Sequence, residues 1–168
     1  MSLQSKLPDV GTTIFTIMSR LAAEHNAINL SQGFPDFDAD PSLILAVSEA
    51  MAKGQNQYAP MPGLPDLNVA IARKLHGDYG WMPDPETEIT VTAGGTQALY
   101  SIIGAMISQG DEVIVLEPSY DSYIPSVVSF GGVVKTVQLL PPSYKVNWDE
   151  VESLITSRTK LIMINTPH

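Results

Sequence analysis

The sequence predicts an α/β protein with three α/β/α layers built around a mostly parallel sheet. From residue 88 onward, strand-like apolar runs alternate with helical patterns, which is typical of a parallel sheet covered by helices. Apolar residues make up 44% of the 168 residues and charged residues 16%, so the chain is globular and long enough to bury a core. The sheet is expected to be incomplete, and the chain to be part of a protein, because little follows the last strand-like run at 160–165.

The first half of the chain predicts helices joined by irregular segments. The expected helices, read from apolar residues at helical spacing, are 13–24, 41–53 and 64–79. Asp40 before Pro41 is a helix start signal, and Gly54 ends that pattern. Residues 1–11 are expected to form an irregular arm, and 28–37 (INLSQGFPDF) a strand end and a loop.

The second half predicts strands that alternate with helices. The expected strands are 88–93, 112–117, 133–139 and 160–165, and the expected helices between them are 96–108, 120–130 and 148–157. Glu150 stands three residues after Asn147, which resembles a capping box at the start of the last helix. Because open α/β sheets bind ligands at the carboxyl ends of their strands, a ligand site is expected in the loops at that edge.

Composition and charge exclude several classes of function. The net charge of −9 argues against a nucleic-acid-binding protein, and the absence of cysteine excludes disulfides, thiolate zinc sites and cysteine nucleophiles. His25, His76 and His168 are too far apart in sequence for a helical metal motif, so no metal is expected. No apolar run is long enough for a membrane span and MSLQSKLPDV is not a secretory signal, so a cytoplasmic protein is expected.

The stretch ITVTAGGTQALYS, residues 89–101, places two glycines between a strand-like run and a helical run. The first N–H groups of a helix have no partner inside the helix and lie at its positive end, so they suit a phosphate. Gly94 and Gly95 allow a close backbone approach. Thr96 can add a hydroxyl and Gln97 another N–H. The stretch matches neither a Walker loop nor GxGxxG, so a plain tight turn remains the alternative.

An aromatic feature follows the next strand. EPSYDSY, residues 117–123, is expected to emerge at the same edge of the parallel sheet as the glycine turn. Tyr120 could then lie flat against a planar ring whose phosphate sits at the helix N-terminus. The alternative is that Tyr120 and Tyr123 only pack at a helix start.

Five motifs in this order and spacing resemble a known family. They are QGFPDF, NQYAPMPG, TAGGTQAL, GDEVIVLEPSYDSY and INTPH. From Lys6 to His168 the chain resembles the N-terminal half of the class I/II aminotransferases, which are pyridoxal-phosphate (PLP) enzymes of fold type I. Within them it resembles the methionine aminotransferase and kynurenine–oxoglutarate aminotransferase branch. The resemblance implies an incomplete fold type I large domain over 41–168, preceded by an arm and a small-domain segment over 1–40.

The resemblance also implies roles for cofactor-binding residues. Gly95, Thr96 and Gln97 would form the cup for the PLP phosphate, and Tyr120 would stack on the pyridine ring. Tyr58, in NQY, would reach the phosphate of the neighbouring subunit, since sites of this family are built at a homodimer interface. An ordinary loop aromatic is the alternative for Tyr58.

Two further residues would face the substrate in this family. Gly33 would contact the substrate carboxylate through its backbone, and Phe15 would lie near the substrate side chain. The alternatives are a chain turn for Gly33 and a core position for Phe15. The aspartate for the pyridine nitrogen, the Schiff-base lysine and the arginine for the carboxylate all lie beyond His168 in the family, so no catalytic residue is expected among these 168 residues.

The function implied for the complete protein is PLP-dependent transamination. An amino acid, methionine or an aromatic or large neutral one, would exchange its amino group with a 2-oxo acid. The 168 residues alone are expected to be inactive. The alternatives are a PLP-dependent C–S β-lyase, a non-catalytic aminotransferase-like module for binding or assembly, and a nucleotide-binding α/β domain of another kind.

Overall fold

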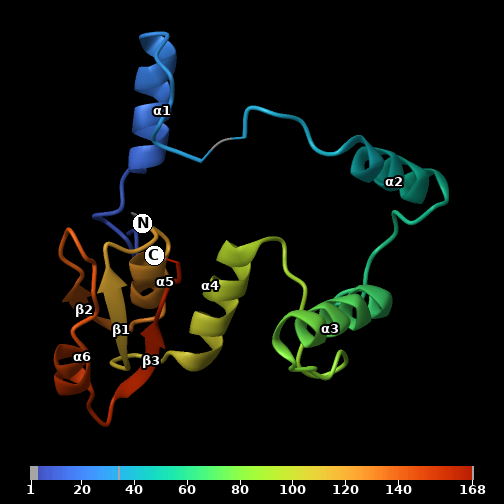
Figure 1. Cartoon of the computed structure of the whole chain (residues 1–168). Helices are drawn as coiled ribbons and strands as arrows, with labels where there is room; N and C mark the ends of the chain where they lie inside the picture. The colour runs from blue at the N-terminus through green and yellow to red at the C-terminus, as the bar shows by residue number, and fades with distance from the viewer. Residues whose placement is uncertain (1–3, 34, 168) are drawn as a thin grey trace. The chain divides into compact units, whose positions relative to one another are not determined.

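Helices and a small parallel sheet make up the computed structural model, which describes residues 4–33 and 35–167 (Figure 1). His168, the last residue of the INTPH motif, lies outside the described residues. The chain divides into two compact units. One unit joins the residues up to Arg20 with those from Ala93 onward, and the other is Leu21–Thr92. No helix in the described part of the chain is long and apolar enough to cross a membrane.

The first three helices match their predicted ranges to within one residue. They are α1 (Ile14–Glu24), α2 (Pro41–Ala52) and α3 (Pro65–Tyr79). Asp40 begins α2 as predicted, because its carboxylate accepts a hydrogen bond from the Ser42 N–H at 2.8 Å. Helix α3 ends at Gly80, whose φ of +71° is the left-handed conformation that glycine adopts without strain.

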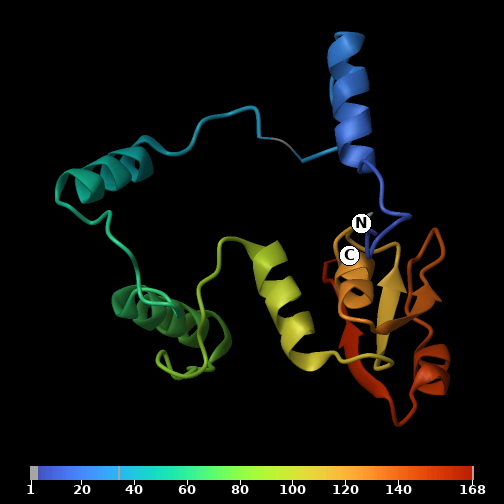
Figure 2. The same ribbon diagram turned by 180° about the vertical axis from the view of Figure 1, so that it is seen from behind.

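The unit that includes the residues from Ala93 onward contains a three-stranded parallel sheet. Its elements in chain order are α4 (Gly95–Met106), β1 (Glu112–Glu117), α5 (Tyr123–Ser129), β2 (Val133–Gln138), α6 (Trp148–Leu154) and β3 (Thr159–Met163). The strand order is β2-β1-β3, so β1 is the central strand, as the view from behind also shows (Figure 2). The capping prediction for α6 is confirmed, since the Asn147 side chain accepts a hydrogen bond from the Glu150 N–H.

The core of this unit lies on both faces of β1. On one face, Val113 and Val115 pack with buried residues of α4 and α5. On the other face, Ile114 and Leu116 pack with residues of β2 and with Val151 of α6. Helices therefore cover both faces of the sheet, which gives the predicted α/β/α layers. The continuous apolar run of β1 reflects this burial on both faces.

A buried carboxylate joins the three strands where β1 begins. The Glu112 side chain is 1% exposed, and its oxygens lie 2.8 Å from Lys135 Nζ on β2 and 2.7 Å from Arg158 Nη2 beside β3. The Thr156 hydroxyl donates to the same carboxylate at 2.6 Å. The hydrogen bond from Lys135, followed by that from Thr156, lowers the pKa of Glu112 to about 2. Lys135 also donates to the Leu154 carbonyl, which ties the end of α6 to the cluster.

Two strand predictions are wrong, those for 88–93 and for the start of 28–37. The segment 88–93 is not a strand, because its Val91 N–H donates to the Pro62 carbonyl at 2.9 Å instead of to a neighbouring strand. No described residue of 28–37 is in a strand either. Apolar character alone does not make a strand, since the ladder needs a backbone partner.

We expect Glu112→Gln to lower the midpoint of thermal unfolding by several degrees, because it removes the buried carboxylate that pairs with the partly buried Lys135 and with the exposed Arg158. The pKa of Glu112 is depressed from 4.5 to about 2, so its stabilising contribution is present above pH 4.5 and is lost as the pH falls toward 2. Circular dichroism melts of the product of the complete gene, at pH 7 and at acid pH, measure both effects.

The matched control is Glu49→Gln, which removes the exposed i,i+4 pair with Lys53. This change should cost less than about 0.5 kcal/mol. Equal melting temperatures for the two variants would contradict the structural role of Glu112.

Candidate functional site

The predicted glycine turn opens α4 at the end of its unit where β1 also ends (Figure 1). Gly94 precedes the helix with φ 105° and ψ 162°, a conformation that is essentially restricted to glycine. A Cβ at Gly94 or Gly95 would meet no other atom within 4 Å, so the outer side of the turn is open. The turn thus leaves room for a ligand against its backbone.

No side chain of the N-cap residue binds the first N–H groups of α4. The first bond of the helix runs from the Ala98 N–H to the Gly94 carbonyl at 3.2 Å. The N–H groups of Gly95, Thr96 and Gln97 therefore belong to the first turn, where a helix has no carbonyl to offer them. Together with the helix dipole, this arrangement favours an anion.

The structure brings Phe15 and Tyr120 together. Their ring centroids are 6.5 Å apart with an interplanar angle of 32°. The ring of Tyr123 is also near, 6.0 Å from that of Tyr120 between ring centroids, and its backbone N–H donates to the Tyr120 carbonyl. Tyr120 remains 49% exposed, so part of its ring is available to a planar ligand.

Tyr58 and Gly33 belong to the other unit, Leu21–Thr92, and are described there. The Tyr58 side chain is fully exposed and lines a surface pocket of about 530 Å³ in the loop between α2 and α3. A Cβ at Gly33 would meet no atom within 4 Å. Both residues are thus accessible from outside their unit.

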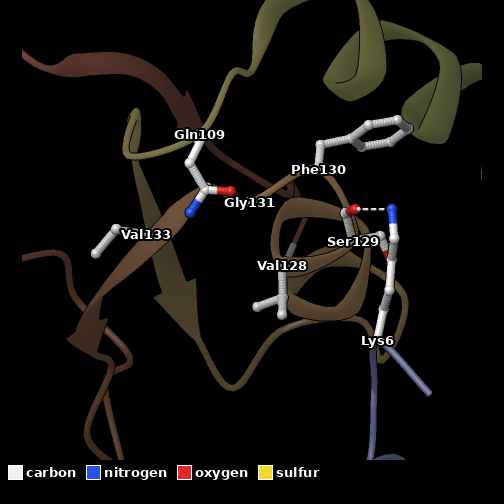
Figure 3. A pocket seen from close by; sticks show the side chains of 8 residues that line it. Lys6, Gln109, Val128, Ser129, Phe130, Gly131 and Val133 are labelled. Carbon is white, nitrogen blue, oxygen red and sulfur yellow. Dashed lines mark hydrogen bonds between the residues drawn. The ribbon is translucent and has the colours of Figure 1, made fainter. Parts of the chain in front are cut away.

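A larger hollow of about 630 Å³ lies where the N-terminal arm meets α5 (Figure 3). Lys6 lines one side of it and donates to the Ser129 carbonyl at 3.3 Å. Gln109 and Val133 line its other side. None of the site residues predicted from the sequence lines this hollow, so we do not assign the ligand site to it.

Sequence reasoning missed two side-chain hydrogen bonds near the site. The Gln97 side-chain oxygen accepts from the Ala93 N–H at 2.6 Å, and the Gln138 amide donates to Glu117 at 2.6 Å where β1 and β2 end. The first had a usable signal, because Gln three residues into a helix after its N-cap is the acceptor of a capping box. The second had none, since it depends on the register that pairs Glu117 with Gln138.

Comparison with known protein families gives one match, to aminotransferases of class I and II, over residues 25–168. Among curated proteins, the chain is 54% identical to the methionine aminotransferase of Escherichia coli over 98% of this chain and 43% of that protein. It is 35% identical to human kynurenine–oxoglutarate transaminase 1 over 89% of this chain and 38% of that protein.

Solved structures that match the chain are aminotransferases as well. An Escherichia coli protein with a methionine aminotransferase function matches 100% of this chain and 44% of its own, with a TM-score of 0.96 at 53% identity. The N-succinyldiaminopimelate aminotransferase of Mycobacterium tuberculosis matches 99% of this chain and 44% of its own, with a TM-score of 0.92 at 40% identity. The chain therefore spans less than half the length of the relatives it matches.

We expect Gly94→Ala to lower the free energy of unfolding by about 1–3 kcal/mol, because alanine cannot adopt φ 105° and ψ 162° without strain. The matched control is Gly95→Ala, which stands in a helix with open space around its Cβ. That change should be neutral or stabilising by up to about 1 kcal/mol. Denaturant unfolding of both variants measures the difference, and a similar loss in both would disprove the special role of Gly94.

Proposed function

Since this chain belongs to the class I and II aminotransferases, we propose that the complete protein is a PLP-dependent transaminase acting on an amino acid with a large uncharged side chain. The observation that carries the proposal is the joint presence of an open glycine turn at the start of α4 and a half-exposed Tyr120 after β1. The first suits a phosphate and the second a planar ring. PLP combines the two in one molecule.

The residues of the turn fit the cofactor phosphate. The N–H groups of Gly95, Thr96 and Gln97 would donate to its oxygens, and the Thr96 hydroxyl would add a fourth donor. Tyr120 would lie against the pyridine ring and hold its plane, with the rings of Phe15 and Tyr123 in contact with it. When bound, PLP supplies an electron sink for the carbanion formed at the substrate Cα.

A separate lysine is needed to move the proton at the substrate Cα. In the unit that holds the glycine turn, Lys6 donates to the Ser129 carbonyl and Lys135 pairs with Glu112. Neither can serve the site without giving up these partners. Lys145 and Lys160 of the same unit are exposed, and neither stands in a stretch that matches the lysine motif of the family. We propose that this lysine lies in the part of the relatives that the chain does not span, and we expect the 168 residues alone to be inactive.

Substrate choice is proposed to depend on Phe15. Its ring lies beside Tyr120, so it would face the substrate side chain next to the cofactor plane. An aromatic ring there favours methionine or an aromatic amino acid over aspartate, and the 54% identity to a methionine aminotransferase supports this choice. The Gly33 backbone would bind the substrate carboxylate. A cytoplasmic location is part of the same proposal.

The active form is proposed to be a homodimer. Tyr58 is fully exposed in its own unit, which is unusual for a tyrosine without a partner surface. We propose that its hydroxyl reaches the cofactor phosphate of the neighbouring subunit. The division into a segment over 1–40 and a large-domain part over 41–168 belongs to this proposal as well.

The product of the complete gene should convert methionine and a 2-oxo acid into the 2-oxo acid of methionine and a new amino acid. After PLP addition and borohydride reduction, its denaturing mass spectrum should show a pyridoxyl adduct on a lysine, whereas the 18.2 kDa chain alone should show none. A β-lyase would instead split an S-substituted cysteine, whose sulfur is on Cβ, into pyruvate, ammonia and a thiol, and formation of these products without amino-group exchange would replace transamination by a β-lyase activity. No adduct on any species would disprove the cofactor assignment.

The homodimer proposal predicts complementation between two inactive variants. Tyr58→Phe and Tyr120→Ala should each lower kcat/KM by about tenfold or more, because each removes a contact to the cofactor. A hybrid dimer of the two has one site with both tyrosines intact, so it should regain about half of the wild-type activity. Doubly tagged co-expression isolates the hybrid, and hybrid activity no higher than that of the parents would exclude a contribution of Tyr58 across the interface.

A further inference from the structure

The Gln97 side chain, in the first turn of α4, forms a hydrogen bond with the backbone just before the glycine turn. Its oxygen accepts the Ala93 N–H at 2.6 Å, so it reaches back over Gly94 and Gly95 to the residue before the turn. Gly94 has no side chain that could cap the helix itself. The third residue of the helix therefore binds the backbone that precedes the helix, as the Glu or Gln of a capping box does, although here the donor is the residue before the N-cap.

This arrangement differs from capping elsewhere in the chain. At α2 and α6 the N-cap side chains of Asp40 and Asn147 accept N–H groups of the first helical turn. At α4 the side-chain acceptor instead binds an N–H that precedes the helix. The N–H groups of Gly95, Thr96 and Gln97 are thereby kept clear of any side-chain cap in the same motif.

A direct contact of the Gln97 oxygen with a phosphate is disfavoured. An amide oxygen is an acceptor, as are the phosphate oxygens, so the two repel each other. The Ala93 N–H already satisfies this oxygen at 2.6 Å. The side chain is thus more suited to fix the turn than to bind the anion.

We propose that Gln97 is a positioning residue for the cofactor phosphate. Its side-chain oxygen fixes the path of residues 93–95, and this fixed path aims the three N–H groups of the first turn at one point. The inference rests on the proposed function, because it takes the phosphate of PLP as the anion. It adds a role for the Gln97 side chain that is separate from the Gln97 backbone N–H.

The test compares two substitutions in the product of the complete gene. Gln97→Met has nearly the same shape but no acceptor, whereas Gln97→Glu keeps an oxygen for the Ala93 N–H. Equilibrium dialysis measures the affinity of each apoprotein for PLP and for pyridoxal, which lacks the phosphate. Asn147→Ala, which removes the cap of α6, is the control for a general loss of helix capping.

Gln97→Met should weaken PLP binding by about five- to tenfold, the worth of one hydrogen bond, and leave pyridoxal binding unchanged. Gln97→Glu should weaken PLP binding through repulsion between its carboxylate and the phosphate, and this loss should shrink as the salt concentration rises, whereas the loss in Gln97→Met should not depend on salt. Asn147→Ala should not change PLP affinity. Equal weakening for PLP and pyridoxal, or no effect of Gln97→Met, would overturn the role of Gln97. A wild-type protein that binds no PLP would instead overturn the proposed function, so the two failures are distinguishable.

Discussion

The charge cluster around Glu112 is the interaction on which the sheet depends. A carboxylate that is 1% exposed would be costly by itself, and here it is balanced by Lys135 from β2 and Arg158 from beside β3. The same three residues connect all three strands where β1 begins. Because β1 has this fixed start, its carboxyl end and the loop that carries Tyr120 also have a fixed position. The position of the site at the carboxyl edge of the sheet therefore depends on ion pairs at the opposite edge.

Much of the fold was predictable because local sequence patterns determine where its helices and strands begin and end. Asp40 and Asn147 mark helix starts through their own side chains, and the continuous apolar run of β1 marks a strand buried on both faces. The segment 88–93 has an equally good strand pattern but is not a strand. Its Val91 N–H binds the Pro62 carbonyl, a partner 29 residues away that no local pattern indicates. Pairing between distant segments is the part of the fold that the sequence pattern could not supply.

The candidate site also contains some features that the sequence pattern predicted and others that it could not predict. The glycine turn was predicted from residue types alone, because two glycines stand directly before a helical run, but its use as a phosphate site was indicated only once the EPSYDSY segment and the family resemblance were added. That Phe15 lies 6.5 Å from Tyr120 was not visible, since the two are separated by 105 positions and only the folded chain brings them together. The Gln97 hydrogen bond was predictable only in part. Its spacing is local, yet it becomes meaningful only once Gly94 is known to be the N-cap.

The contact of the N-terminal arm with α5 has a consequence for the order of events during translation. Lys6 and Ser129 are 123 positions apart, so the arm leaves the ribosome long before its partner does. At about 5–20 residues per second, the wait is on the order of 6–25 seconds. The arm therefore contacts α5 only after that helix has been made, and Phe15 likewise reaches Tyr120 only after the 105 positions that separate them have been synthesised.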